Sequence, residues 1–257
     1  MQVIYCGDSP SETEACYLAG ILRNGGISYT YHPDDEGLAS YLESCPPEAF
    51  IFSDLPARRI PEKLQLQIVD RIEAGAGLVM IGGSRSFRGF GGYWNETPLG
   101  RLLPVEMSGT DDRHQSETPM IVKALGRHPI TDDLPWTESP TFIDGLNHVA
   151  CKADDELLLS AEKFDVRDVD GETEVTPADV FPLLCVGQRG HGRVAAFMSD
   201  VGPPWIGSMI DWGPERVIVG PHSPRSNGRH LRMPGIDVGN HYAEFFRRLV
   251  LWTFDRL

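Results

Sequence analysis

The first eighty residues alternate between short hydrophobic runs and segments with a helical period. Four runs are apolar and end near glycine, proline or aspartate, as buried strands do: 3–6, 27–31, 49–54 and 77–83. After Pro61, apolar residues recur every three or four positions, which predicts an amphipathic helix. Strands joined by crossover helices form parallel sheets. The sequence therefore predicts an α/β fold with a three-layer, doubly wound, mainly parallel sheet.

Two more helices are predicted between these strands. The stretch Ser9-Pro10-Ser11-Glu12 fits a capping box, in which Ser9 is the N-cap and Glu12 reaches back to it. That helix should end near Asn24, because two glycines follow it. A shorter helix is predicted over 37–44.

The second half of the chain is predicted to be rich in β-strands. Residues 183–188 and 192–199 flank a short turn with two glycines, which is typical of a hairpin. Residues 201–240 are rich in glycine and proline and show no period, so they predict an irregular loop insertion. The last seventeen residues carry an apolar helical stripe. We expect one domain over 1–257.

Composition narrows the partners and the compartment. The chain has 23 Lys and Arg against 37 Asp and Glu, a net charge of −14, which disfavours nucleic acid and anionic membranes. The start lacks the basic region of a signal peptide, and no apolar run approaches the roughly 18 residues of a membrane span. Five cysteines without a CxxC motif favour reduced thiols. We expect a cytoplasmic protein.

Candidate chemistry gathers where predicted strands end, because ligands of open α/β sheets bind beyond the carboxyl ends of the strands. Asp8, Asp54 and Asp200 each follow such a strand, and the glycine-rich loop from Gly82 to Phe87 follows another. Three carboxylates in one crevice could bind a hard cation such as Mg²⁺. The alternative is that each aspartate caps the turn or helix that follows it.

The loop after Gly82 and Gly83 allows several readings. Its backbone amides could cradle an anion with help from Arg85 and Arg88, or its glycines could only permit tight packing. A hydrolase would need Ser84 or Ser86 paired with a histidine such as His241. A zinc site from His222, His230 and His241 is a further alternative, although their spacing matches no standard pattern.

Three segments together resemble the glutamine-amidotransferase-like family. They are "IEAGAGLVMIGGSRSFRGFGGYWNETPLGRLLPVEM" at 72–107, "GRHPITDDLPWTESPTFIDGLNHV" at 126–149 and "PLLCVGQRGHGRVAAFMSDVGPPW" at 182–205. The resemblance implies a class I glutamine amidotransferase-like, flavodoxin-like fold, related to trehalose-utilisation-type domains. True glutaminases of this fold carry a cysteine on the elbow after the strand and a late His-x-Glu. Here Gly82 stands near the nucleophile position, no His-x-Glu occurs, and Pro204 replaces a histidine of the family pattern. The resemblance thus implies a protein without glutaminase activity.

The sequence predicts a crevice that binds a small polar ligand, such as a sugar or an amide-bearing metabolite, without a cofactor or a metal. Its predicted residues are Asp8, Asp54, Gly82, Gly83, Ser84, Arg85, Ser86, Asp200 and Trp205. Two other hypotheses remain, the serine hydrolase and a structural or assembly module. The latter would associate through the 201–240 loop, which is unusually apolar and therefore favours a homo-oligomer.

Overall fold

A nine-stranded mixed sheet forms the centre of the computed structural model, which describes residues 2–8, 14–32, 38–44, 47–219, 225–226, 229–230, 235–255 and 257. The strand order is β2-β1-β3-β4-β11-β10-β9-β6-β7. The pairings among the first five strands of this order are parallel, and the remaining four are antiparallel. The predicted α/β class is confirmed, with a sheet that is mixed because its second half is antiparallel.

The strands of the main sheet have the following bounds: β1 Gln2–Gly7, β2 Ser28–His32, β3 Ala49–Ser53, β4 Gly77–Ile81, β6 Arg113–Ala124, β7 Phe142–Asn147, β9 Glu156–Val169, β10 Glu172–Arg189 and β11 Gly192–Phe197. Six short strands form three two-stranded sheets: β5 Val105–Glu106 with β8 Ala150–Cys151, β12 Arg216–Val219 with β15 Ile236–Gly239, and β13 Arg225–Ser226 with β14 Arg229–His230. The helices are α1 Glu14–Asn24, α2 Leu38–Ser44, α3 Glu62–Glu73, α4 Pro98–Leu102 and α5 Asn240–Thr253. Three short 3₁₀ helices are η1 Ala57–Arg59, η2 Trp94–Glu96 and η3 Gly207–Asp211.

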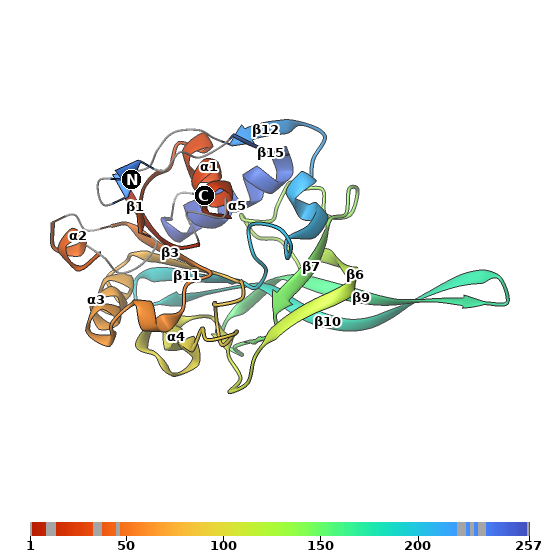
Figure 1. Ribbon diagram of the computed structural model, residues 1–257, viewed down its shortest axis with the longest axis horizontal. Helices are drawn as coiled ribbons and strands as arrows, with labels where there is room; N and C mark the ends of the chain where they lie inside the picture. Colours follow the sequence, from red (N-terminus) through yellow and green to blue (C-terminus); the bar gives the residue numbers. More distant parts are fainter. Residues whose placement is uncertain are drawn as a thin grey trace.

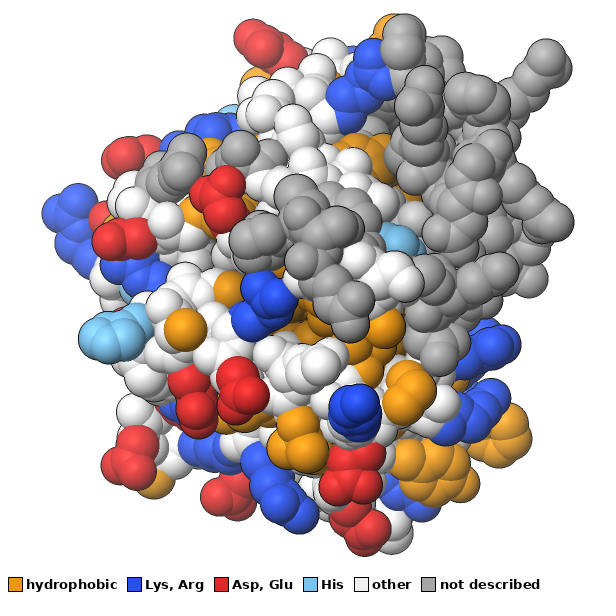
Figure 2. Space-filling view, turned by 90° about the vertical axis from the view of Figure 1, so that its left-hand side faces the viewer, with side chains coloured by type: hydrophobic (Ala, Val, Ile, Leu, Met, Phe, Trp, Pro, Cys, Tyr) orange, Lys and Arg blue, Asp and Glu red, His pale blue; other side chains and the backbone are white. Residues whose placement is uncertain are grey.

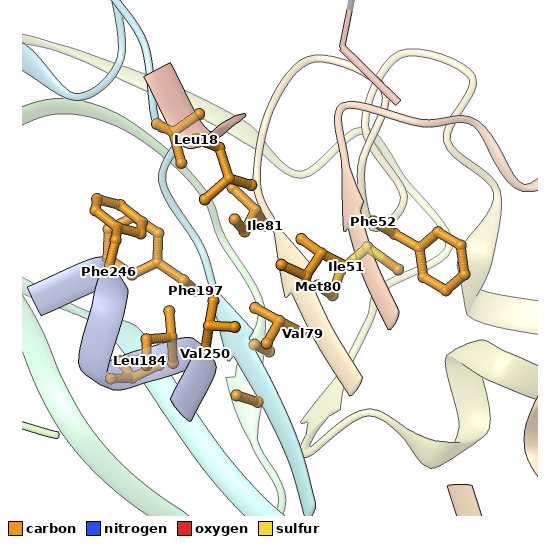
Figure 3. Packing of buried hydrophobic residues seen from close by; sticks show 14 of the residues in the cluster. Leu18, Ile51, Phe52, Val79, Met80, Ile81, Leu184, Phe197, Phe246 and Val250 are labelled. Atoms are coloured by element: carbon orange, nitrogen blue, oxygen red, sulfur yellow. The ribbon is translucent and has the colours of Figure 1, made fainter. Parts of the chain in front are cut away.

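Helices cover both faces of the parallel half, which explains why its strands are apolar on both sides. Helices α1 and α5 lie on one face, and α3 and α4 lie on the other (Figure 1). In β4, Val79 and Ile81 point toward the α1 and α5 layer, whereas Met80 points to the opposite face beside Phe52 of β3 (Figure 3). This alternation places hydrophobic packing on either side of the sheet and holds the strand ends rigidly.

The layer above the parallel half is built around aromatic side chains of α5. Phe246 of α5 meets Phe197 of β11 edge to face, with ring centroids 5.3 Å apart, and Leu18 of α1 lies nearby (Figure 3). All three side chains are fully buried. The predicted apolar stripe of the last helix is therefore core, as its period indicated. The predicted start of α1 at Ser9 to Glu12 lies outside the described residues.

The hairpin of β9 and β10 reaches far beyond the rest of the molecule (Figure 1). We call its projecting part, residues 163–180, the arm. The two strands pair antiparallel from Glu162 and Val180 out to Val169 and Glu172. The turn between them is Asp170-Gly171, both with positive φ (55° and 85°), as a two-residue type I′ turn requires. The predicted strand at 183–188 lies at the base of β10, whereas the arm was not predicted.

The described residues of 201–240 contain more regular structure than the predicted irregular loop. This segment contains η3, and β12 pairs with β15 across it. Ile206, Met209 and Trp212 are buried in the chain's own core. Their apolar character therefore serves internal packing, and it no longer argues for a subunit contact through this segment. None of the helices in the described part of the chain combines the length and apolar character needed to cross a bilayer.

The negative net charge is not gathered into one field on the face drawn in Figure 2. Among the described residues of that face, acidic and basic side chains alternate around a group of hydrophobic ones. Such mixed charge gives no strong local potential of one sign.

Candidate functional site

The three predicted aspartates lie at one edge of the parallel half of the sheet. Asp8 follows β1, Asp54 follows β3 and Asp200 comes shortly after β11, and these strands are separated only by β4 in the sheet order. All three residues are buried, with 4%, 8% and 8% of their surfaces exposed. The prediction that the strand ends bring them into one neighbourhood agrees with this placement. We call the three residues the aspartate cluster.

Asp8 is held by hydroxyl groups of neighbouring strands. Tyr5 donates a short hydrogen bond to its Oδ2, and Ser53 donates to its Oδ1 over 3.2 Å. The Tyr31 hydroxyl donates to the backbone carbonyl of Asp8 over 2.9 Å. Burial, and next the carboxylate of Asp8, raise the pKa of Tyr5 well above its usual value, so Tyr5 remains a hydrogen-bond donor. These three hydroxyl groups were not among the predicted crevice residues, although all three belong to strand residues.

Asp54 forms an ion pair with Arg85. Both side-chain nitrogens Nε and NH2 of Arg85 donate to its Oδ2, over 3.0 and 2.7 Å, and the Arg85 backbone amide donates to Oδ1 over 2.6 Å. Asp54 has a φ of 41°, a left-handed conformation that aspartate tolerates better than most residues. This carboxylate thus fixes the first turn of the glycine-rich loop onto the end of β3.

Asp200 is the uncompensated member of the aspartate cluster. Its pKa is raised well above the usual value, first by burial and then by the nearby charges of Asp8 and Asp54. Its Oδ1 accepts hydrogen bonds from the backbone amides of Val201 (2.6 Å) and Gly202 (3.3 Å), which oppose the shift but do not cancel it. Asp200 therefore caps the turn after β11, as the capping alternative predicted, and its surroundings favour the protonated form of its carboxyl group.

The described residues contain no group of three or more histidine, cysteine, aspartate or glutamate side chains arranged to hold a metal ion. The Mg²⁺ alternative therefore gains no support from the geometry of the cluster. For the zinc alternative, His222 and the side chain of His230 lie outside the described residues.

The close packing of the turn after β4 explains why a glycine stands at the elbow. The Gly82 amide donates to the carbonyls of Phe197 (2.8 Å) and Ser199 (3.0 Å), so the elbow lies directly against β11. A Cβ atom at Gly82 would come within 2.1 Å of the Met198 carbonyl oxygen. A cysteine or serine cannot occupy this position in the present fold, because the space for its side chain is filled by backbone.

The glycine-rich loop binds carboxylates of its own chain. The amides of Arg88 and Gly89 donate to the two oxygens of Asp112, over 2.8 and 2.9 Å. Asn147 bonds Asp112 through Nδ2 (2.8 Å) and accepts from the Gly83 amide through Oδ1 (3.0 Å). The predicted anion cradle is thus wrong for these amides, since Asp112 and Asp54 already occupy those of Arg85, Arg88 and Gly89.

The serine hydrolase is not assembled in the described structure. Ser86 is fully buried and donates to the Ile81 carbonyl over 2.5 Å, whereas Ser84 is exposed. His241 contacts Trp212 with ring centroids 5.3 Å apart and lines a separate cavity of about 610 Å³ with Ser139. Among the described residues, no hydrogen bond joins either serine to a histidine, so the pairing with His241 gains no support. The loop histidine His222 and the side chain of His230 lie outside the described residues.

Trp205, one of the predicted crevice residues, packs inside the protein. Its side chain is only 5% exposed, and its ring lies so close to Gly145 of β7 that a Cβ there would approach it within 2.9 Å. The Trp205 carbonyl accepts from the amides of Asp144 (2.8 Å) and Gly145 (3.0 Å). Trp205 therefore joins the segment after β11 to β7 and offers little free ring surface to a ligand.

This fold, with a glycine elbow at the end of β4 and a cluster of side chains at the strand ends, is of the class I glutamine amidotransferase-like type. Residues 45–216, about two thirds of the chain, match the family described as putative glutamine amidotransferase, GATase1_like. The chain belongs to this family. The match covers Asp54, the elbow and Asp200, but Asp8 lies outside it.

Two solved structures share the whole fold. Cytoplasmic protein STM3548 from Salmonella typhimurium superposes with a TM-score of 0.71 at 19% identity, over 98% of this chain and 99% of that one. Cytoplasmic protein STM1381 from Salmonella typhimurium LT2 gives 0.68 at 22% identity, over the same shares. A beta-galactosidase from Rahnella sp. R3 matches at 0.53 and 12% identity, over 99% of this chain but 31% of that one. No curated protein matches the chain.

Proposed function

We propose that this chain is a cytoplasmic member of the glutamine amidotransferase-like family that does not hydrolyse glutamine and instead binds a small polar ligand at the aspartate cluster. The location rests on the two Salmonella proteins, both described as cytoplasmic. The single observation that carries the binding site is the burial of Asp200 near Asp8 and Asp54, which raises the pKa of its carboxyl group.

The buried Asp200 favours ligand binding on energetic grounds. Burial and the nearby charges of Asp8 and Asp54 both disfavour the charged form of Asp200, and this cost lowers the stability of the fold. Groups with strongly shifted pKa values gather at functional sites more often than elsewhere. A ligand with hydroxyl or amide groups would donate hydrogen bonds to Asp8 and accept one from protonated Asp200. This chemistry fits a sugar or an amide-bearing metabolite.

Glutaminase chemistry at the elbow is disfavoured for a steric reason as well as a chemical one. A thioester needs a thiol at the elbow, and Gly82 has neither a side chain nor room for one. When the purified protein is incubated with glutamine, we expect ammonia release at the rate of the buffer alone. Turnover above that rate that survives repeated purification would contradict the proposal.

The binding proposal is tested by an equilibrium screen of sugars and amides against the wild-type protein. A ligand of the aspartate cluster should raise the melting temperature of the wild type, and Asp200→Asn or Asp54→Asn should weaken its binding at least tenfold. Asp154→Asn serves as the control, since Asp154 is exposed in a turn far along the chain. Ligands that bind all four proteins equally, or a screen without any ligand that depends on the cluster, would contradict the proposed site.

A further inference from the structure

The arm leaves one edge of β9 without a partner strand. Residues 159–162 of β9 pair with β6, and that pairing ends at Glu162. From 163 to 169, β9 pairs with β10 on one side only, and no strand in the described part of the chain covers the other side. A free strand edge presents unpaired backbone amides and carbonyls, which makes it a template for another strand.

The two free edges of the arm differ in how they are protected. The outer edge of β10 carries Pro177, which cannot donate a backbone hydrogen bond, and the acidic Glu172 and Glu174. The edge of β9 has no proline, and its charged residues alternate in sign: Lys163, Asp165, Arg167 and Asp168. Only the β9 edge is therefore suited to pairing, and its own charges can complement a second copy of themselves.

We propose that two copies of this chain pair through their β9 edges, antiparallel about a two-fold axis at Val166, to form a four-stranded sheet from two arms. In this register Val166 faces Val166 of the second copy. Asp165 faces Arg167 of the second copy, and Arg167 faces its Asp165, so the axis generates two cross-strand ion pairs. Opposite charges in facing positions stabilise a sheet, and like charges destabilise it.

The charge pattern selects this register over its neighbours. Facing residues of an antiparallel pair must share a face of the sheet, so the axis moves by whole residues. An axis at Asp165 would place Asp165 opposite itself and Lys163 opposite Arg167. An axis at Arg167 would place two arginines opposite each other. Both alternatives bring like charges together. An axis at Phe164 would face Lys163 with Asp165, but it would also need Ala161 and Glu162, whose edge already pairs with β6. The axis at Val166 satisfies both signs with the free residues alone.

Asp165 and Arg167 would exchange their ion pair within one copy for ion pairs between copies, at little cost in free energy. Within one copy, Arg167 and Asp165 lie 3.6 Å apart, and their side chains are 73% and 49% exposed. An exposed ion pair of this kind contributes little to stability. Val166 is 59% exposed and gains a hydrophobic neighbour in the pair. Because the contact is only a seven-residue edge, the dimer should be weak and populated at high protein concentration.

Disulfide trapping of Val166→Cys tests the geometry directly. Facing residues of an antiparallel pair have Cα atoms about 4.5–5.5 Å apart, within the range of about 4.4–6.8 Å that a disulfide spans. Val175→Cys is the matched control, because Val175 faces Val166 on β10 and is 58% exposed. In the proposed sheet the two Val175 positions are three strand spacings, about 14 Å, apart. Mild oxidation should therefore give covalent dimers of Val166→Cys but not of Val175→Cys or the wild type.

Charge exchange tests the register by sedimentation. Arg167→Asp should weaken the dimer at least tenfold, and the double variant D165R/R167D should restore it, because the exchanged charges again face each other. Arg59→Asp makes the same change of charge in η1 and should leave the dimer unchanged. A protein that stays monomeric up to its solubility limit, equal trapping at position 175, or a double variant that fails to dimerise would each overturn the proposal.

Discussion

Replacing Gly82 with alanine is expected to lower the free energy of unfolding by about 3 kcal/mol, the upper end of the range for overfilled cores. The added Cβ would lie 2.1 Å from the carbonyl oxygen and 2.6 Å from the carbonyl carbon of Met198. These are backbone atoms, so relief requires β4 and β11 to move apart. That movement would stretch the hydrogen bonds from the Gly82 amide to Phe197 and Ser199. Chemical denaturation of the purified variant measures the loss.

The control is Gly109→Ala in the same protein. A Cβ at Gly109 would meet no atom within 4 Å, so its effect should stay within about 0.5 kcal/mol. Equal stabilities of the two variants would show that the elbow adapts easily, and the steric argument against a nucleophile would fail. Gly82→Cys should behave like Gly82→Ala and should gain no glutaminase activity.

Asp200→Asn is expected to stabilise the protein by about 1–2 kcal/mol at neutral pH, as replacements of strained functional groups commonly do. Asparagine keeps the oxygen that accepts from Val201 and Gly202 but carries no charge. The raised pKa of Asp200 means that the folded state holds this proton more tightly than the unfolded state. Its stability is therefore full below the unfolded pKa of about 3.9 and falls as pH rises through the folded pKa.

The pH dependence provides the decisive measurement for Asp200. The stability difference between the variant and the wild type should be small near pH 4 and should grow with pH until Asp200 ionises in the folded state. Asp54→Asn is the control within the same cluster, because Asp54 is paired with Arg85 and its replacement should not stabilise the protein. A difference for Asp200→Asn that does not change with pH would show that titration of this carboxyl is not the cause.

The parallel half of the fold could be predicted from the sequence because its signals are local. The runs that became β1, β3 and β4 are apolar at consecutive positions and end in aspartate or glycine, which fixed both the strands and the edge where Asp8 and Asp54 lie. The neighbourhood of Asp200 followed from the same rule, since its strand joins the sheet beside β4. Parallel sheets align the ends of their strands, so residues distant in sequence could be placed together.

The second half of the site could not be placed in this way. Asp112 and Asn147 belong to an antiparallel region, and they reach the glycine loop because the chain after β11 returns to β7 at Trp205. No local pattern marks that return. The pair Asp111-Asp112 before a strand and the Gly-Leu-Asn stretch were the available signals, but neither indicates a partner 35 residues away.

The arm, in contrast, has a local hairpin pattern in its sequence. Its turn is Asp-Gly, flanked by alternation of Phe164 and Val166 on one strand and Val175 on the other, which is typical of a hairpin with a type I′ turn. Its charged residues masked the period because only one face of the arm is apolar. The surroundings of Ser84 and Ser86 could not be predicted for another reason. The exposure of a serine and the partner of its hydroxyl group depend on backbone geometry that no motif specifies.

The glycine-rich loop is hydrogen-bonded to residues of both halves of the sheet. Asp54 holds its first turn to the parallel half, and Asp112 holds its middle to the antiparallel half. Asp112 also lines a cavity of about 510 Å³ together with His148. A ligand that bound Arg85 in place of Asp54 would break the bonds that hold the first turn of the loop. It would thereby loosen the contact of the loop with Asp112. Binding at the strand ends would then change the shape of the cavity that Asp112 lines.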